Sequence, residues 1–341
     1  MAGQVDVPAR SRGSSSRPDR STDRGGRTSI ADPEARVARL ERAAVLGAAL
    51  ADQLSDPVRF AVALADAFRE LAEPEYRAGQ AFVAPGIGPT HGVRTPLQVR
   101  LRRAFERRTR GASPTELILI ADRLLREPER EARWFAIGTL QRTIEPEPER
   151  TWQLLRRAAA DADDWVTVDT LAHPYGRGIL AEAYRWAEVE QLTVSPSRWE
   201  RRLVGSTIAT VPFVDRRAGR EPDVAAIALR VLATLIGDRE PDVQKSLSWA
   251  YRSMTIVDPR ATTAALEREA SIASERADGH RAWVVRDSLA KLEPEAAQRI
   301  RASLAGIRRR AGAPSTSEAA ALAEQFGDMG LGRALPQPPL T

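Results

Sequence analysis

The chain has 341 residues, of which 43% are hydrophobic, so it could fold as one long or two ordinary domains with a sizeable core. It contains no cysteine, which excludes disulfides and thiolate metal sites, and its formal net charge of +5 is modest for this length. Any surface that binds a polyanion must therefore come from local clustering. Its three histidines lie far apart in sequence, and we predict no metal and no cofactor.

The amino-terminal segment 1–31 is rich in Arg, Ser and Gly and lacks the apolar centre of a signal peptide. We interpret it as a disordered basic arm. Helical periodicity begins near Asp32 and continues to Leu54, and a second helix is expected over 57–71. The glycines and prolines of 81–96 then predict a long irregular loop.

Beyond that loop, apolar residues recur with helical spacing and no period-2 run predicts a strand. One internal repeat is visible, because Arg220–Asp238 is followed directly by Arg239–Asp258 at an offset of 19 residues. A helix pair of about 38 residues is close to the period of HEAT and armadillo arrays. The fold class that we predict is all-α, with HEAT-like helical repeats that form a curved right-handed solenoid with a concave face. The expected helices span about 96–109, 115–126, 129–143, 148–160, 164–172, 177–187, 197–211, 222–236, 240–254, 259–275, 281–291 and 294–309.

The tail 312–341 is rich in Pro, Ala, Ser and Gly, and we expect it to be mostly disordered. The domain prediction is thus an arm over 1–31, a helical-repeat domain over 32–311 and a tail over 312–341. No apolar run reaches the roughly 18 to 20 residues of a membrane span, so we expect no membrane partner and a cytoplasmic location.

An acid and an indole share one predicted helix face. Trp165 and Asp169 lie four residues apart, so both side chains should project from the same side. The alternative is a buried tryptophan beside an aspartate that caps neighbouring backbone.

The second copy of the internal repeat has the same spacing in Lys245 and Trp249, where the first copy has Ala226 and Arg230. Because Arg230 faces away from the apolar stripe, Trp249 should also lie off the buried seam. An exposed tryptophan indicates a ligand surface, although a packing role stays open.

Several cations are candidates for contacts with phosphate. Arg201 and Arg202 are adjacent and cannot share a helix face, so one can meet a phosphate while the other pairs locally, unless both are simply solvated. Thr95 at an N-cap before Pro96 predicts a helix start whose free N–H groups can bind phosphate, with Arg94 beside it. Further basic residues crowd one segment: Arg100, Arg102, Arg103, Arg107, Arg108 and Arg110.

The stretches DDWVTVD, WERRLVGSTI and VQKSLSWAYR, in that order over about 75–292, resemble the DNA alkylation repair family of HEAT-like-repeat glycosylases that excise alkylated purines. The resemblance puts the catalytic aspartate on Asp169, the paired tryptophans on Trp165 and Trp249, and a site arginine on Arg202. The sequence departs from the family pattern at Val166 and in an inserted GIGPTH before GVRTP. The expected DNA-backbone contacts are Arg202, Lys245, Arg201, Arg94, Thr95 and Arg252.

The resemblance implies a base-excision repair enzyme that acts on double-stranded DNA containing alkylated bases such as 3-methyladenine and 7-methylguanine. It also implies cleavage while the lesion remains stacked in the duplex. We expect a monomer that associates with the nucleoid through DNA. Two alternatives stay open: a HEAT-like scaffold for protein partners, and a binder of DNA damage without catalysis. The retention of Asp169 disfavours the second alternative.

Overall fold

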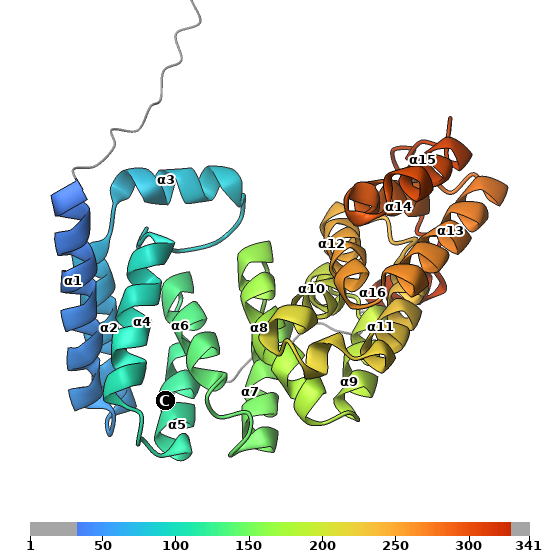
Figure 1. Cartoon of the computed structure of the whole chain (residues 1–341). Helices are drawn as coiled ribbons and strands as arrows, with labels where there is room; N and C mark the ends of the chain where they lie inside the picture. Colours follow the sequence, from blue (N-terminus) through green and yellow to red (C-terminus); the bar gives the residue numbers. More distant parts are fainter. Residues whose placement is uncertain (1–32, 329–341) are drawn as a thin grey trace, which may run out of the picture. The chain divides into compact units, whose positions relative to one another are not determined.

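The computed structural model describes residues 33–328, and every regular element in this range is a helix, with no strand, which confirms the all-α prediction (Figure 1). The chain divides into two compact units, Met1–Ala38 and Arg39–Thr341, and the packing described below lies in the second. Short 3₁₀ helices at Leu50–Gln53 (η1), Leu192–Val194 (η2), Ala218–Arg220 (η3) and Leu289–Lys291 (η4) join some of the α-helices. The α-helices are α1 (Pro33–Ala49), α2 (Pro57–Leu71), α3 (Pro74–Val83), α4 (Thr95–Arg108), α5 (Pro114–Leu124), α6 (Arg130–Leu140), α7 (Pro148–Ala160), α8 (Trp165–Ala181), α9 (Arg185–Gln191), α10 (Arg198–Val214), α11 (Pro222–Leu235), α12 (Pro241–Val257), α13 (Pro259–Glu275), α14 (Gly279–Ser288), α15 (Pro294–Ser303) and α16 (Glu318–Asp328).

Local sequence signals start many of these helices. Proline occupies the first turn of α2, α5, α11 and α12, where its missing N–H costs no intrahelical hydrogen bond. Ser113 and Glu116 form a capping box at the start of α5. Asp164 caps α8 by accepting the N–H of Thr167 at 2.8 Å. The boundaries of these helices therefore follow from residues that the sequence displays.

The helices pack as two layers. In one layer α6, α8, α10, α12 and α14 follow one another as neighbours, and α5, α7, α11 and α13 cover them from the second layer. The repeated segments form α11 and α12, which pack against each other, so the helix pair predicted from the 19-residue offset is present. In α11 the predicted stripe is buried at Ala228, Val231, Leu232 and Leu235. The central helices α8, α10 and α12 carry the candidate site residues.

Two prolines lie inside helices. The sequence predicts separate helices over 164–172 and 177–187, and this prediction is wrong because α8 continues through the buried Pro174. Packing against α10 covers this part of α8, and the hydroxyl of Thr210 donates to the carbonyl of Ala172 at 3.0 Å. Pro212 similarly lies inside α10, which reaches Val214 instead of ending at 211. Burial of the surrounding face outweighs the hydrogen bond that each proline removes.

The helix α3 is absent from the prediction. α3 has no buried residue, and its last residues 81–83 belong to the segment predicted as loop. From Ala84 the irregular loop is present as predicted, with positive φ at Gly86, Gly88 and Gly92.

The tail prediction is wrong for 312–328, because this segment contains α16. The side chains of Ala319, Ala320 and Ala323 are buried, and α16 packs against η2 and α11. The N–H of Thr316 donates to the carbonyl of Gly237 at 2.8 Å, which fixes the approach to the helix. Alanines one turn apart form a narrow apolar stripe that needs little surface to dock against. The predicted arm 1–31 and the last residues 329–341 lie outside the described residues.

Across the described range, none of the helices combines the length and the apolar character that a bilayer crossing requires.

Candidate functional site

The candidate site centres on Asp169, in α8. The guanidinium of Arg202 donates two hydrogen bonds to its carboxylate, from Nε to Oδ1 at 3.2 Å and from Nη2 to Oδ2 at 2.8 Å. Ser206, one turn further along α10, donates its hydroxyl to Oδ1 at 2.7 Å. The side chain of Asp169 stays 23% exposed while that of Arg202 is only 7% exposed. The carboxylate is therefore fixed by charge-assisted hydrogen bonds from its buried side and open to solvent on the other.

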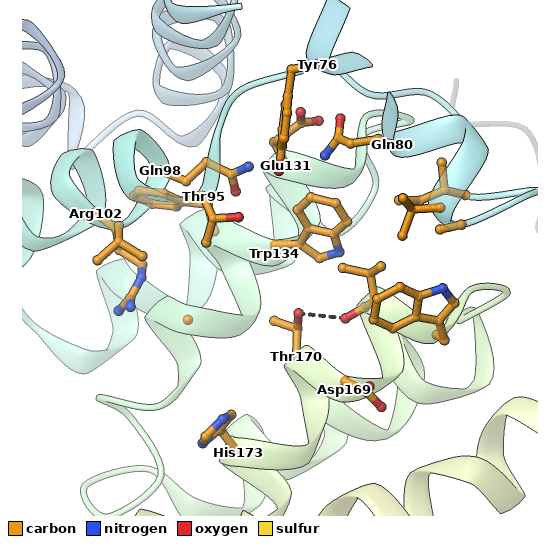
Figure 2. Close-up of a pocket in the computed structure, with 18 of the residues that line it drawn as sticks. Tyr76, Gln80, Thr95, Gln98, Arg102, Glu131, Trp134, Asp169, Thr170 and His173 are labelled. Atoms are coloured by element: carbon orange, nitrogen blue, oxygen red, sulfur yellow. Dashed lines mark hydrogen bonds between the residues drawn. The ribbon is translucent and has the colours of Figure 1, made fainter. Parts of the chain in front are cut away.

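Asp169 lines a cavity of about 810 Å³ between α3, α4, α6 and α8. Three indoles line the same cavity within the described range: Trp165 at the start of α8, Trp249 on α12, and Trp134 on α6. Figure 2 shows Asp169, Thr170 and His173 projecting from α8 along one side of the cavity and Trp134 near its centre. The structure thus brings together the acid and both tryptophans that the sequence singled out.

Trp249 is half-buried and packs partly against the core, so the prediction that it lies off the buried seam is only half right. The reason is that α12 contacts α10, α11, α13 and α14, which leaves little of its surface uncovered. Its counterpart Arg230 in α11 is exposed and pairs with Glu190 at 2.6 Å. Lys245, one turn before Trp249, is exposed and has no ion pair among the residues that the structure describes.

A hydrogen-bond chain holds the start of α8 against α6. The indole Nε1 of Trp134 donates to Oγ1 of Thr167 at 3.0 Å, and that hydroxyl donates to Oδ2 of the N-cap Asp164 at 2.7 Å. The buried Arg130 lies 3.5 Å from the same carboxylate and pairs with Asp163 at 2.5 Å. These contacts fix the helix turn from which Trp165 and Asp169 project.

Arg130 also holds the inserted loop, because its Nε donates to the carbonyl of Ile87 and its backbone N–H to that of Pro89, at 2.5 and 2.9 Å. Gly88 lies against this guanidinium with φ of +78°, and a Cβ there would come within 2.7 Å of Nη2. The insertion is therefore anchored to the site through one buried cation.

Glu131, fully buried on α6, fixes the next part of the loop. Its carboxylate accepts the backbone N–H groups of His91, Gly92 and Val93 at 3.0, 2.9 and 3.2 Å. Neither Arg130 nor Glu131 is among the site residues predicted from the sequence. The only signal for them is a charged pair at the start of a helix whose other residues are mostly apolar, and such a pair gives no hint of a partner some forty residues away.

His173 lies exposed at the edge of the cavity, one turn from Asp169 on α8. Partial removal from water and the charge of Arg177 lower the pKa of His173, while the charge of Asp169 acts in the opposite direction. The imidazole is therefore neutral near pH 7 and adds no positive charge to the cavity.

Two predicted phosphate contacts are wrong because both arginines are buried. Arg201 donates through Nε to the buried Asp238 at 2.7 Å and through Nη1 to the carbonyl of Ser195 at 2.8 Å. Besides its two bonds to Asp169, Arg202 donates a hydrogen bond from Nη1 to the carbonyl of Asp242 at 2.7 Å. Adjacent residues on a helix point in different directions, and here both directions lead into packed interfaces.

The other predicted cations lie at the surface but have partners. Arg94 is paired with Glu73 at 2.6 Å, and Arg252 with Asp287 at 2.7 Å. Burial opposes ionisation of both acids, but hydrogen bonds hold the pKa of each carboxyl below its usual range. Glu73 accepts these bonds from Arg94 and Arg39, and Asp287 accepts them from Ser248 and Arg252. These arginines are thus partly neutralised before any ligand arrives.

The helix start predicted at Thr95 is displaced by one residue. Arg94 is the N-cap, no side chain caps the helix, and Thr95 is its first residue, exposed and lining the cavity. No cluster of His, Asp or Glu suited to a metal ion occurs in residues 33–328.

The fold and the cavity define a helical-repeat protein in which a fixed but partly exposed carboxylate, that of Asp169, lies among three indoles. A family model described as "DNA alkylation repair enzyme" matches residues 64–292, and the chain belongs to this family. Repair of alkylation damage in DNA is accordingly its functional class, with DNA as the substrate. A solved structure described as a predicted DNA alkylation repair enzyme from Enterococcus faecalis is similar at 14% sequence identity, with a TM-score of 0.48, over 70% of this chain and 98% of that one. No curated protein matches the chain.

Proposed function

We propose that the protein is a DNA glycosylase that hydrolyses the N-glycosidic bond of positively charged alkylated purines, such as 3-methyladenine and 7-methylguanine, in duplex DNA. The observation that carries the proposal is the carboxylate of Asp169, held by Arg202 and Ser206 and open to a cavity with aromatic walls.

Alkylation at N3 of adenine or N7 of guanine gives the base a positive charge, so it can leave without being protonated by the enzyme. The bond between C1′ of the deoxyribose and the base nitrogen breaks, and its electron pair neutralises the departing base. The sugar then carries the positive charge as an oxocarbenium-like species. A water oxygen bonds to C1′, and its proton passes to a carboxylate oxygen and then to solvent, which leaves an abasic site.

Asp169 suits both tasks in this step. A fixed anion beside the sugar stabilises the developing charge without reorganisation, and a carboxylate oxygen that keeps a free lone pair, as Oδ2 does here, can accept the proton of water. Arg202 and Ser206 occupy the buried side of the carboxylate, so the exposed side is free to face the sugar. Arg202 acts here as a positioning residue for the acid.

The indoles of Trp165 and Trp249 would flank the deoxyribose and the cationic base. Face contacts between an indole and a cation contribute on the order of 0.5 to 2 kcal/mol each. The neutral state of His173 near pH 7 avoids a like charge beside the lesion.

Mass spectrometry of the bases released from methylated duplex DNA tests the proposal. The wild-type protein should release 7-methylguanine or 3-methyladenine, and Asp169→Asn should release neither above the rate of spontaneous loss while it still binds the duplex. A protein-interaction scaffold or a non-catalytic damage binder would release no base in either case, and this result would refute the proposal.

A further inference from the structure

A second cleft continues from the candidate site. It has a volume of about 550 Å³ and shares Arg102, Gly138 and Gln141 with the cavity that contains Asp169. Its other lining residues lie in the second half of α4 and just after it, just after α6, and toward the end of α8: Arg103, Glu106, Arg107, Arg110, Arg142 and Arg177. Figure 2 shows Arg102, one of the three shared residues, at the α4 side of the first cavity.

The charge of this cleft is strongly one-sided. Glu106 is its single acid, and it is paired with Arg102. Arg142 is held by Thr109, to whose Oγ1 and carbonyl it donates at 2.9 and 2.6 Å. Burial lowers the pKa of Arg142, although the charge of Glu106 partly opposes this. These three side chains are already satisfied within the protein.

Four arginines of the cleft differ from these three. Arg103, Arg107, Arg110 and Arg177 are exposed, and none of them has a hydrogen bond or ion pair among the described residues. Four unpaired like charges around one cleft repel one another, and a polyanion that neutralises them would relieve that repulsion.

The position of Arg177 relates the cleft to the catalytic acid. Asp169, His173 and Arg177 follow one another at four-residue spacing on α8, so Arg177 lies about 12 Å along the helix from Asp169.

We propose that this cleft binds the backbone phosphates of duplex DNA on one side of the lesion, through Arg103, Arg107, Arg110 and Arg177. The inference rests on the proposed function, which puts the lesion beside Asp169. It supplies the phosphate contacts that the burial of Arg201 and Arg202 removes from the predicted set.

Binding of an undamaged duplex to the full-length protein, measured by fluorescence anisotropy over a range of salt concentrations, tests this proposal. The double variant Arg103→Gln, Arg107→Gln should make the slope of log K against log salt less negative by about 1.8, since each phosphate contact contributes about 0.9. This corresponds to a loss of about 60-fold in affinity at 0.1 M salt that disappears toward 1 M.

The matched control is the double variant Arg108→Gln, Arg301→Gln. It loses the same charge from exposed residues of α4 and α15 that do not line the cleft, and it should leave the slope near its wild-type value. Equal changes in both double variants would show a general charge effect, and an unchanged slope in the first would show no phosphate contact. Either result overturns the proposal. Because undamaged DNA is the probe, the outcome does not depend on whether the protein releases bases.

Discussion

Replacement of Arg202 by Gln separates the positioning of Asp169 from ordinary stability, because the neighbouring Arg201 provides a matched control. Each arginine is buried and pairs with one aspartate, but only the Arg202 pair faces the cavity. Breaking a fully buried ion pair costs about 3 to 5 kcal/mol. This range applies to Arg201→Gln, since both Arg201 and Asp238 are 5% exposed or less.

For Arg202→Gln the loss of stability should be smaller, about 2 kcal/mol, because the exposed side of Asp169 can be solvated by water once its partner is gone. At roughly 2 °C per kcal/mol for a chain of this size, Tm should fall by about 4 °C, against about 8 °C for Arg201→Gln. Base excision should show the reverse order. A misplaced carboxylate costs on the order of 100-fold in rate, whereas Arg201→Gln should change the rate little below its Tm.

The assay combines thermal unfolding with single-turnover release of 7-methylguanine from duplex DNA, at a temperature where both variants are folded. If Arg201→Gln and Arg202→Gln lose excision in proportion to their loss of Tm, Arg202 is a structural residue only and the reasoning fails.

Three further changes test separate parts of the site. Trp249→Ala should slow excision roughly tenfold, equal to about 1.4 kcal/mol, and a normal rate combined with a large loss of Tm would mark Trp249 as a packing residue only. Lowering the pH from 7 through the depressed pKa of His173 creates an imidazolium beside the cationic lesion, so excision above the enzyme-free rate should fall with acidification. His173→Gln should flatten this profile, and an unchanged profile in that variant would contradict the assignment. Gly88→Ala brings a methyl group against the guanidinium of Arg130, so it should lower Tm and the excision rate more than Gly86→Ala. At Gly86 φ is also positive, but no atom lies within 4 Å of the added Cβ. Equal effects of the two variants would mean that only backbone strain matters.

The parts of the site that were predictable from sequence are those set by local geometry. Trp165 and Asp169 are four residues apart, and any helix puts such residues on one face. The 19-residue offset likewise predicted that α11 and α12 pair, since two similar amphipathic helices in succession bury their apolar stripes against each other.

The failures concern burial that depends on distant segments. Nothing near Arg201 and Arg202 in sequence shows that Asp238 and Asp242 lie beside them, so the exposure of both arginines could not be judged. The docking of α16 depends in the same way on contacts with η2 and α11, more than eighty residues away. Pro174 predicted a helix end because proline removes a hydrogen bond within the helix, but the packing that outweighs this loss comes from α10.

The anchoring of the inserted loop was equally hidden. Arg130 and Glu131 hold residues 87–93 from α6, and both would be unremarkable surface charges in an isolated helix. Their burial shows that the insertion is part of the site's support.

The rate of base release by Asp169→Asn under single-turnover conditions, with enzyme saturating a duplex that contains one 7-methylguanine, tests the central claim most directly. Saturation removes differences in binding, and Asn keeps the size of the side chain while it removes the charge. If Asp169 is the catalytic carboxylate, the rate should fall at least about 100-fold while affinity for the duplex is largely retained. A rate equal to that of the wild-type protein would contradict this role.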